Sequence, residues 1–190
     1  LELELMVAED EATGRGAFTV SVDLVDGNTT GSSPADQART IAALARAEVA
    51  ADDFARPGYV FPLRAREGGV LKRAGHAEAV VDLCRLAGLS PVGVVADLVS
   101  VTGDMMPLDD AAAFAADNDL LLVSIADVVR HRRKSEILVE QMGVARVPTK
   151  HGDFMCHAYR SVLDGVDHIA FVMGDVDGGD PPLVRVHSEC

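Results

Sequence analysis

The chain has 190 residues, 48% hydrophobic and 25% charged, which indicates a folded protein rather than a disordered one. Its 17 basic and 30 acidic residues give a formal net charge of −13, which argues against broad binding to nucleic acid or anionic membranes. The absence of Trp and the 4% aromatic content argue against stacking on bases. Three distant cysteines, no visible signal peptide and no apolar run of about 18 residues favour a cytoplasmic chain without disulfides or a membrane helix.

In chain order, the apolar pattern predicts strands and helices that alternate over the first 142 residues. Alternating apolar residues predict strands at 1–7 and 17–24, and a further short strand is predicted at 59–63. Continuous apolar runs predict buried strands at 92–99 and 120–125. The predicted helices span residues 34–49, 76–87, 109–117 and 126–142.

Local signals mark the ends of two of these helices. Ser33 is typical of an N-cap, and Pro34 is typical of the first helical position. Gly88 is expected to end the helix that begins at His76.

A change of pattern near residue 142 predicts a domain boundary. Strand-like segments separated by Gly and Asp turns dominate after it, at 154–159, 169–174 and 183–187. We therefore predict one unit of helices and strands over 1–142 and the start of a mostly β unit over 143–190.

The basic, glycine-rich segment 64–75 (RAREGGVLKRAG) stands out in an otherwise acidic chain. Its glycines would let backbone N–H groups approach a ligand, and Arg73 offers a fork for phosphate oxygens. A helix that begins near His76 adds its positive N-terminal end. The segment therefore predicts a site for a phosphate-bearing small molecule, and the alternative is a solvated basic loop before an ordinary helix.

Three further features have both a functional and a structural interpretation. His76, at a helix N-terminus, suits metal binding or proton transfer, and equally a packed or capping histidine. Asp97 ends a predicted buried strand, where ligands often collect, or it caps the next loop. The hydroxyl-rich turn 26–36 suits contacts to sugar or phosphate, or simply turn and cap formation.

Several stretches together carry a family resemblance. They are AFTVSVD (17–23), TTGSSPAD (29–36), RPGYVFPLRAREGGVLKRAGHAEA (56–79) and the apolar segment that ends at Asp97. They resemble the 3,4-dihydroxy-2-butanone 4-phosphate synthase family over residue 1 to about residue 133. The stretches that resemble the start of GTP cyclohydrolase II are RVPTKHGDF (146–154), LDGVDHIA (163–170) and VRVHSEC (184–190). This order is that of bifunctional riboflavin-biosynthesis proteins.

The resemblance implies an α+β fold with a mixed sheet flanked by helices, followed by the first strands of a mostly β domain. It implies a lyase that converts ribulose 5-phosphate to 3,4-dihydroxy-2-butanone 4-phosphate and formate with Mg²⁺ or Mn²⁺, usually as a homodimer. Its ligands would be small molecules, with no nucleic acid and no membrane. The family's sugar-phosphate run, whose histidine is a metal ligand, corresponds here to Arg73, Ala74, Gly75, His76 and Ala77.

Some positions depart from the family pattern. Tyr59 replaces a histidine and Asp97 a glutamate, both at positions that the resemblance marks as catalytic, and Asp97 also belongs to the substrate site. Ala77 replaces a threonine, and Gln37 replaces a basic residue. The family's acidic metal-binding loop is absent from this chain, so we expect these 190 residues alone to be inactive. The alternative is a degenerate, non-catalytic synthase-like domain that acts as a scaffold or dimerisation module.

The last residues resemble parts of the cyclohydrolase site. The segment that resembles a GTP-contacting run consists of Arg185, Val186, His187, Ser188 and Glu189. Cys190 resembles the first zinc ligand, and the other two zinc cysteines are expected beyond residue 190. The resemblance therefore implies GTP and Zn²⁺, with a zinc site that is incomplete in this chain.

Overall fold

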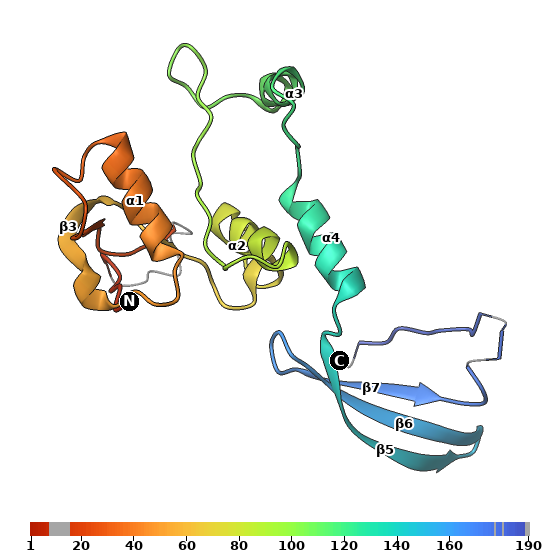
Figure 1. Ribbon diagram of the computed structural model, residues 1–190. Coiled ribbons are helices and arrows are strands. Elements are labelled where there is room, and N and C mark those ends of the chain that lie inside the picture. The colour runs from red at the N-terminus through yellow and green to blue at the C-terminus, as the bar shows by residue number, and fades with distance from the viewer. Residues whose placement is uncertain (8–15, 177, 180, 189–190) are drawn as a thin grey trace. The chain divides into compact units, whose positions relative to one another are not determined.

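The computed structural model describes residues 1–7, 16–176, 178–179 and 181–188. The chain divides into two compact units, Leu1–Lys134 and Ser135–Cys190 (Figure 1). The described residues form four α-helices and three small antiparallel sheets, which confirms the α+β class. No helix in this described part is long and apolar enough to cross a membrane.

The first unit begins with two short antiparallel strand pairs. The strands are β1 (Ala17–Phe18) with β4 (Leu63–Arg64), and β2 (Val22–Leu24) with β3 (Phe54–Val60). The predicted strand 17–24 is therefore present but is divided between two sheets. The predicted strand 59–63 falls on the end of β3 and the start of β4. Among the described residues, the predicted strand 1–7 forms a single isolated bridge, from Leu5 to Thr19.

Helix α1 (Pro34–Leu44) starts where the sequence predicts it, because Ser33 Oγ accepts a hydrogen bond from the Asp36 backbone N–H over 3.1 Å. The helix is shorter than the predicted 34–49, and Val49 packs back against the unit's first hydrophobic core instead. The fully buried members of this core are Val22, Ala43 and Phe54.

A second small core forms around α2 (His76–Leu86), which begins at the predicted residue and ends one residue before the predicted end at 87. Its partners are the short 3-10 helix η2 (Gly69–Leu71) and α4 (Ile125–Ser135). The buried hydrophobic residues that meet there are Val70, Ala79 and Val128. The basic segment 64–75 is thus anchored at one point in a core rather than lying wholly in solvent.

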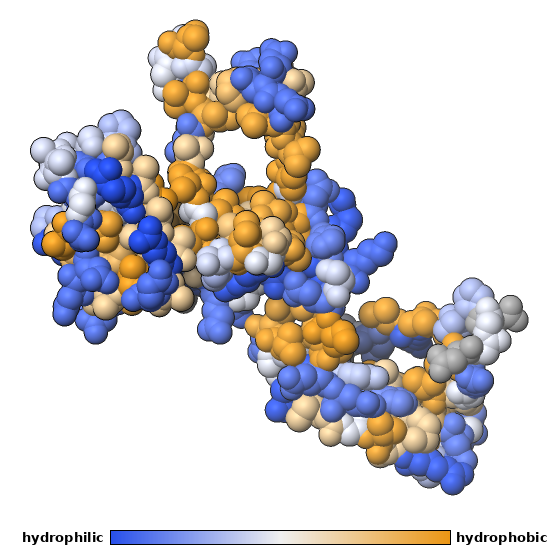
Figure 2. All heavy atoms as spheres, in the orientation of Figure 1, coloured by the Kyte–Doolittle hydropathy of each residue, from blue (hydrophilic) through white to orange (hydrophobic). Residues whose placement is uncertain are grey.

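The predicted buried strands 92–99 and 120–125 are wrong. Apart from one bridge at Val99, these residues pair with no strand in the described part of the chain, and Leu121 is 94% exposed. Figure 2 shows apolar side chains at the surface on the two connections that flank α3 (Leu108–Asp117). An apolar run indicates a tendency to be buried but does not supply the neighbouring backbone that a strand needs.

The second unit is an antiparallel sheet in the order β5-β6-β7. Its strands are β5 (Val139–Thr149), β6 (Gly152–Ser161) and β7 (Asp167–Val172). The predicted strands near 154–159 and 169–174 are confirmed, whereas 183–187 forms no strand. The predicted helix 126–142 is too long, because residues from Val139 onward pair with β6 and this backbone pairing outweighs local helix propensity.

Candidate active site

The basic segment 64–75 leads directly into the N-terminus of α2. Gly75 is the N-cap of α2 in an extended conformation and has no side chain to accept hydrogen bonds from the first turn. In the described part of the chain no side chain caps the N–H groups of the first turn, and such an uncapped helix end suits an anion. Arg73 lies three residues before the first residue of α2, and its side chain is 29% exposed.

Two glycines of this segment have a neighbour that the sequence interpretation did not include. A β-carbon on Gly69 would lie 2.2 Å from Asp82 Oδ1, and one on Gly75 would lie 2.2 Å from Glu78 Oε2. Both distances are far below a van der Waals contact. These glycines therefore make room for two carboxylates of α2, apart from any role in approaching a ligand.

Glu78 lies beneath the segment and is fully buried. Its Oε1 accepts from the Arg66 backbone N–H over 3.0 Å and from Arg73 Nη1 over 3.5 Å. Its Oε2 is buried and has no hydrogen-bond partner among the described residues. Glu78 thus restrains the arginine that we expect to contact phosphate.

Asp82 lies one turn further along α2 and is 2% exposed. Its Oδ2 accepts from the Val70 backbone N–H over 2.8 Å and from Arg132 Nη1 over 2.7 Å. The same Arg132 nitrogen donates to the Gly68 carbonyl over 2.8 Å. Sequence reasoning missed these contacts, although the i, i+4 spacing of Glu78 and Asp82 places both carboxylates on one helix face, together with buried Ala79.

The structure places the predicted site residues in separate surroundings. Arg73 to Ala77 are contiguous at the start of α2, where His76 is exposed. Tyr59, on β3, is 56% exposed, and Asp97 lies exposed outside helices and strands. Within the described part of the chain, no hydrogen bond or ion pair joins Tyr59, His76 and Asp97 to one another.

The described residues do not by themselves fit a magnesium ion. Nowhere among them do three or more His, Cys, Asp or Glu side chains gather in a way that could hold a metal. Magnesium prefers six oxygen ligands, whereas His76 offers one ring nitrogen. The nearby carboxylate of Glu78 is buried under the loop, where it contacts Arg66 and Arg73.

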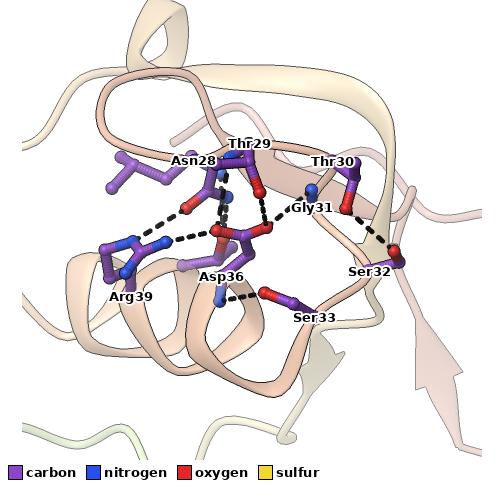
Figure 3. A network of polar contacts seen from close by, with 10 residues as sticks. Asn28, Thr29, Thr30, Gly31, Ser32, Ser33, Asp36 and Arg39 are labelled. Carbon is purple, nitrogen blue, oxygen red and sulfur yellow. Dashed lines mark hydrogen bonds and ion pairs between the residues drawn. The ribbon is translucent and has the colours of Figure 1, made fainter.

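The hydroxyl-rich turn is organised by Asp36 (Figure 3). This fully buried carboxylate accepts from Thr29 Oγ1 over 2.8 Å, from the Gly31 N–H over 3.1 Å and from the Arg39 guanidinium. Burial alone would raise the pKa of Asp36, but the hydrogen bonds from Thr29 and Arg39 outweigh it and hold the pKa well below its usual range. The turn therefore supports the structural interpretation, with Asp36 as a carboxylate that is charged at neutral pH.

The predicted GTP-contacting segment lies in the second unit without regular structure. Its described members, Arg185, Val186, His187 and Ser188, are exposed. Glu189 and Cys190 lie outside the described residues.

The chain resembles known proteins along its whole length. Residues 1–131 match the family model for 3,4-dihydroxy-2-butanone 4-phosphate synthase, and residues 140–190 match that for GTP cyclohydrolase II. It is 54% identical to the bifunctional riboflavin biosynthesis protein RIBA 1, chloroplastic, of Arabidopsis thaliana, over all of this chain and 35% of that protein. It is also 54% identical to the monofunctional riboflavin biosynthesis protein RIBA 2, chloroplastic, of the same plant, over all of this chain and 40% of that protein. Identity to the riboflavin biosynthesis protein RibBA of Nocardia farcinica is 50%, over all of this chain and 46% of that protein.

Solved structures give the same result. The two-domain synthase RibBX from A. baumannii superposes with a TM-score of 0.78 at 37% identity, covering 93% of this chain and 52% of that one. A synthase in complex with two magnesium ions superposes with a TM-score of 0.64 at 39% identity, covering 71% of this chain and 68% of that one. The chain spans less than half the length of the curated relatives described above. With two thirds of its residues matched, the chain belongs to the 3,4-dihydroxy-2-butanone 4-phosphate synthase family.

Proposed function

We propose that this chain carries the sugar-phosphate site of an enzyme of riboflavin biosynthesis, which converts ribulose 5-phosphate to 3,4-dihydroxy-2-butanone 4-phosphate and formate. The reaction is balanced without an oxidant or reductant, because the two products contain all the atoms of the substrate. The observation that carries the proposal is the basic segment 64–75, which ends in an uncapped helix N-terminus beside Arg73.

In this proposal the phosphate group lies at the start of α2. Arg73 donates to phosphate oxygens, and the backbone N–H groups of His76 and Ala77 meet the same negative charge. Tyr59 and Asp97 are proposed to contact the sugar and transfer protons, with their side chains in the positions of a family histidine and glutamate. Both side chains are exposed, which leaves them open to solvent and to a ligand.

The proposed metal is Mg²⁺ or Mn²⁺, with His76 as one ligand. The described residues supply no cluster of further ligands, so the remaining oxygen ligands have to come from the sugar, from water or from sequence outside the described part of the chain.

The test uses the complete gene product with ribulose 5-phosphate and MgCl₂, and measures formate by NMR. Wild-type protein is expected to release formate. Arg73→Gln is expected to raise KM at least about tenfold, because a charge-assisted contact to phosphate is lost. Arg130→Gln on α4, which removes an exposed arginine, is the matched control and should leave KM unchanged. Folded wild-type protein that releases no formate would contradict the proposal.

A second function is a non-catalytic synthase-like scaffold or dimerisation module. Its support is the combination of Tyr59, Ala77 and Asp97 with the absence of a metal-ligand cluster among the described residues. A relative of equal identity is named monofunctional, and it fits this alternative as well as the first. Under the alternative, a variant with Tyr59→His, Ala77→Thr and Asp97→Glu gains formate release that the wild type lacks. A wild type that is already as active as this variant excludes the alternative.

We further propose that residues 143–190 begin a GTP cyclohydrolase II domain after a synthase domain at 1–142. In it, Arg185 to Glu189 contact GTP and Cys190 is one of the zinc ligands. The family match over 140–190 supports this proposal. We also propose that the protein is a homodimer and lies in the cytoplasm. The plant relatives are named chloroplastic, so the location has to be tested by experiment. Light scattering of the complete gene product measures the oligomeric state.

A further inference from the structure

We propose that Asp82 and Arg132 form a clamp that positions the segment 64–75, so that both are positioning residues for the sugar-phosphate site. This inference rests on the proposed function. Neither residue lies in the motif that resembles the sugar-phosphate run. Arg132 is 50 residues from Asp82 in sequence, so the clamp joins parts of the chain that local patterns treat separately.

Asp82 and Arg132 form a short and largely buried ion pair. Asp82 Oδ2 and Arg132 Nη1 are 2.7 Å apart, and their side chains are 2% and 13% exposed. Water therefore screens this ion pair much less than it screens the surface pair of Arg130 with Asp127, whose side chains are 76% and 52% exposed.

Each partner of this ion pair also contacts the backbone of the segment 64–75. Asp82 accepts from the Val70 N–H over 2.8 Å, and Arg132 donates to the Gly68 carbonyl over 2.8 Å. Between these two contacts lies Gly69, whose φ of +61 suits glycine and whose Cα faces the Asp82 carboxylate. The ion pair thus fixes a bend of three residues from both sides.

Hydrogen bonds to the Gly69 carbonyl connect this bend to the proposed phosphate site. The Gly69 carbonyl accepts from the Arg73 backbone N–H over 3.1 Å and from the Lys72 N–H over 3.0 Å. The position of the Gly69 carbonyl therefore determines the position of the Arg73 backbone. The Arg73 guanidinium also donates to Glu78 of α2. Arg73 is therefore restrained through its backbone by the bend and through its side chain by α2.

The experiment compares Arg132→Gln with Arg133→Gln in the complete gene product. Arg133 is the next residue of α4 and is exposed, so its variant removes the same charge outside the clamp. Arg132→Gln is expected to raise KM for ribulose 5-phosphate at least about tenfold with kcat changed less than about threefold, because positioning of the phosphate contact is lost. Arg132→Lys, which keeps the charge, is expected to recover part of the KM. Equal effects of Arg132→Gln and Arg133→Gln would overturn the proposal.

A second measurement separates the clamp from the proposed function. Amide hydrogen exchange of Val70 and Arg73 is expected to become at least about tenfold faster in Arg132→Gln than in Arg133→Gln, whether or not the protein turns over substrate. Unchanged exchange in folded Arg132→Gln removes the clamp, while absent formate with changed exchange removes only the proposed function. If Arg132→Gln does not fold, Asp82→Asn, which removes the charge of the other partner, carries the same comparison with Arg133→Gln, and wild-type exchange at both amides then contradicts the clamp.

Discussion

The Oε2 atom of Glu78 occupies the space beside Gly75, 2.2 Å from where a β-carbon on that glycine would lie. The space beside the glycine in the run that resembles a sugar-phosphate site is therefore occupied by a buried carboxylate of the protein itself. Its neighbourhood is fixed before any ligand arrives. We therefore expect Gly75 to affect the stability of the protein as well as the binding of a ligand.

Gly75→Ala should destabilise the protein by about 1–3 kcal/mol, because the added methyl group overpacks against Glu78. The double variant Gly75→Ala with Glu78→Asp should recover part of this loss, since the shorter side chain withdraws the carboxylate. Urea unfolding followed by circular dichroism measures both. Gly143→Ala is the control, because in the described part of the chain no residue other than its own chain neighbours lies within 4 Å of the new carbon. A Gly75→Ala variant as stable as Gly143→Ala contradicts the overpacking.

Thr40 joins α1 to β2 through its hydroxyl. This fully buried oxygen accepts from the Leu24 N–H and from Asn28 Nδ2, both over 3.0 Å. Thr40→Val keeps the shape but leaves both donors without an acceptor, so a loss of about 1–3 kcal/mol in the free energy of unfolding is expected. Thr102→Val, at an exposed position, should change it by less than about 0.5 kcal/mol. Equal values for the two variants would show that the Thr40 hydroxyl contributes nothing.

Asp36 makes the stability of the first unit dependent on pH. Its pKa is lower in the folded protein than in the unfolded chain, so the folded state binds fewer protons in acid. The stabilisation is therefore complete above the unfolded pKa of about 4 and is lost as pH falls below that value. Asp36→Asn should flatten the fall in unfolding free energy between about pH 4 and pH 2. Thr29→Val, which removes one donor and keeps the carboxylate, should flatten it less. An unchanged pH slope in Asp36→Asn would be inconsistent with this assignment.

Sequence reasoning predicted well where the signal and its structural partner are close together in the chain. The Ser33 cap, both ends of α2 and the hairpin strands β6 and β7 depend on neighbours within a few residues or across one turn. The basic segment was also singled out from sequence. What holds it in place was not, because the contact of Arg132 with Gly68 spans 64 residues and no local pattern encodes it. For the same reason, an apolar run predicts a strand even where the described chain offers no partner strand.

The segment 92–98 tests whether an apolar run without a partner strand forms a strand in solution. Its residues form no strand, and Val94 is 65% exposed. The amide of Val92 bonds only to Ser90 nearby, and for the amides of Gly93 to Leu98 no backbone acceptor is present among the described residues. These amides should therefore exchange within seconds to minutes, like those of loops, while amides within α2 exchange at least about a hundredfold more slowly. Exchange measured by NMR on the purified chain decides whether the segment is a loop or a paired strand. Protection of Gly93 to Leu98 equal to that of α2 would show that the segment pairs as a strand in solution, as its apolar pattern predicts, and that its apolar side chains are then covered.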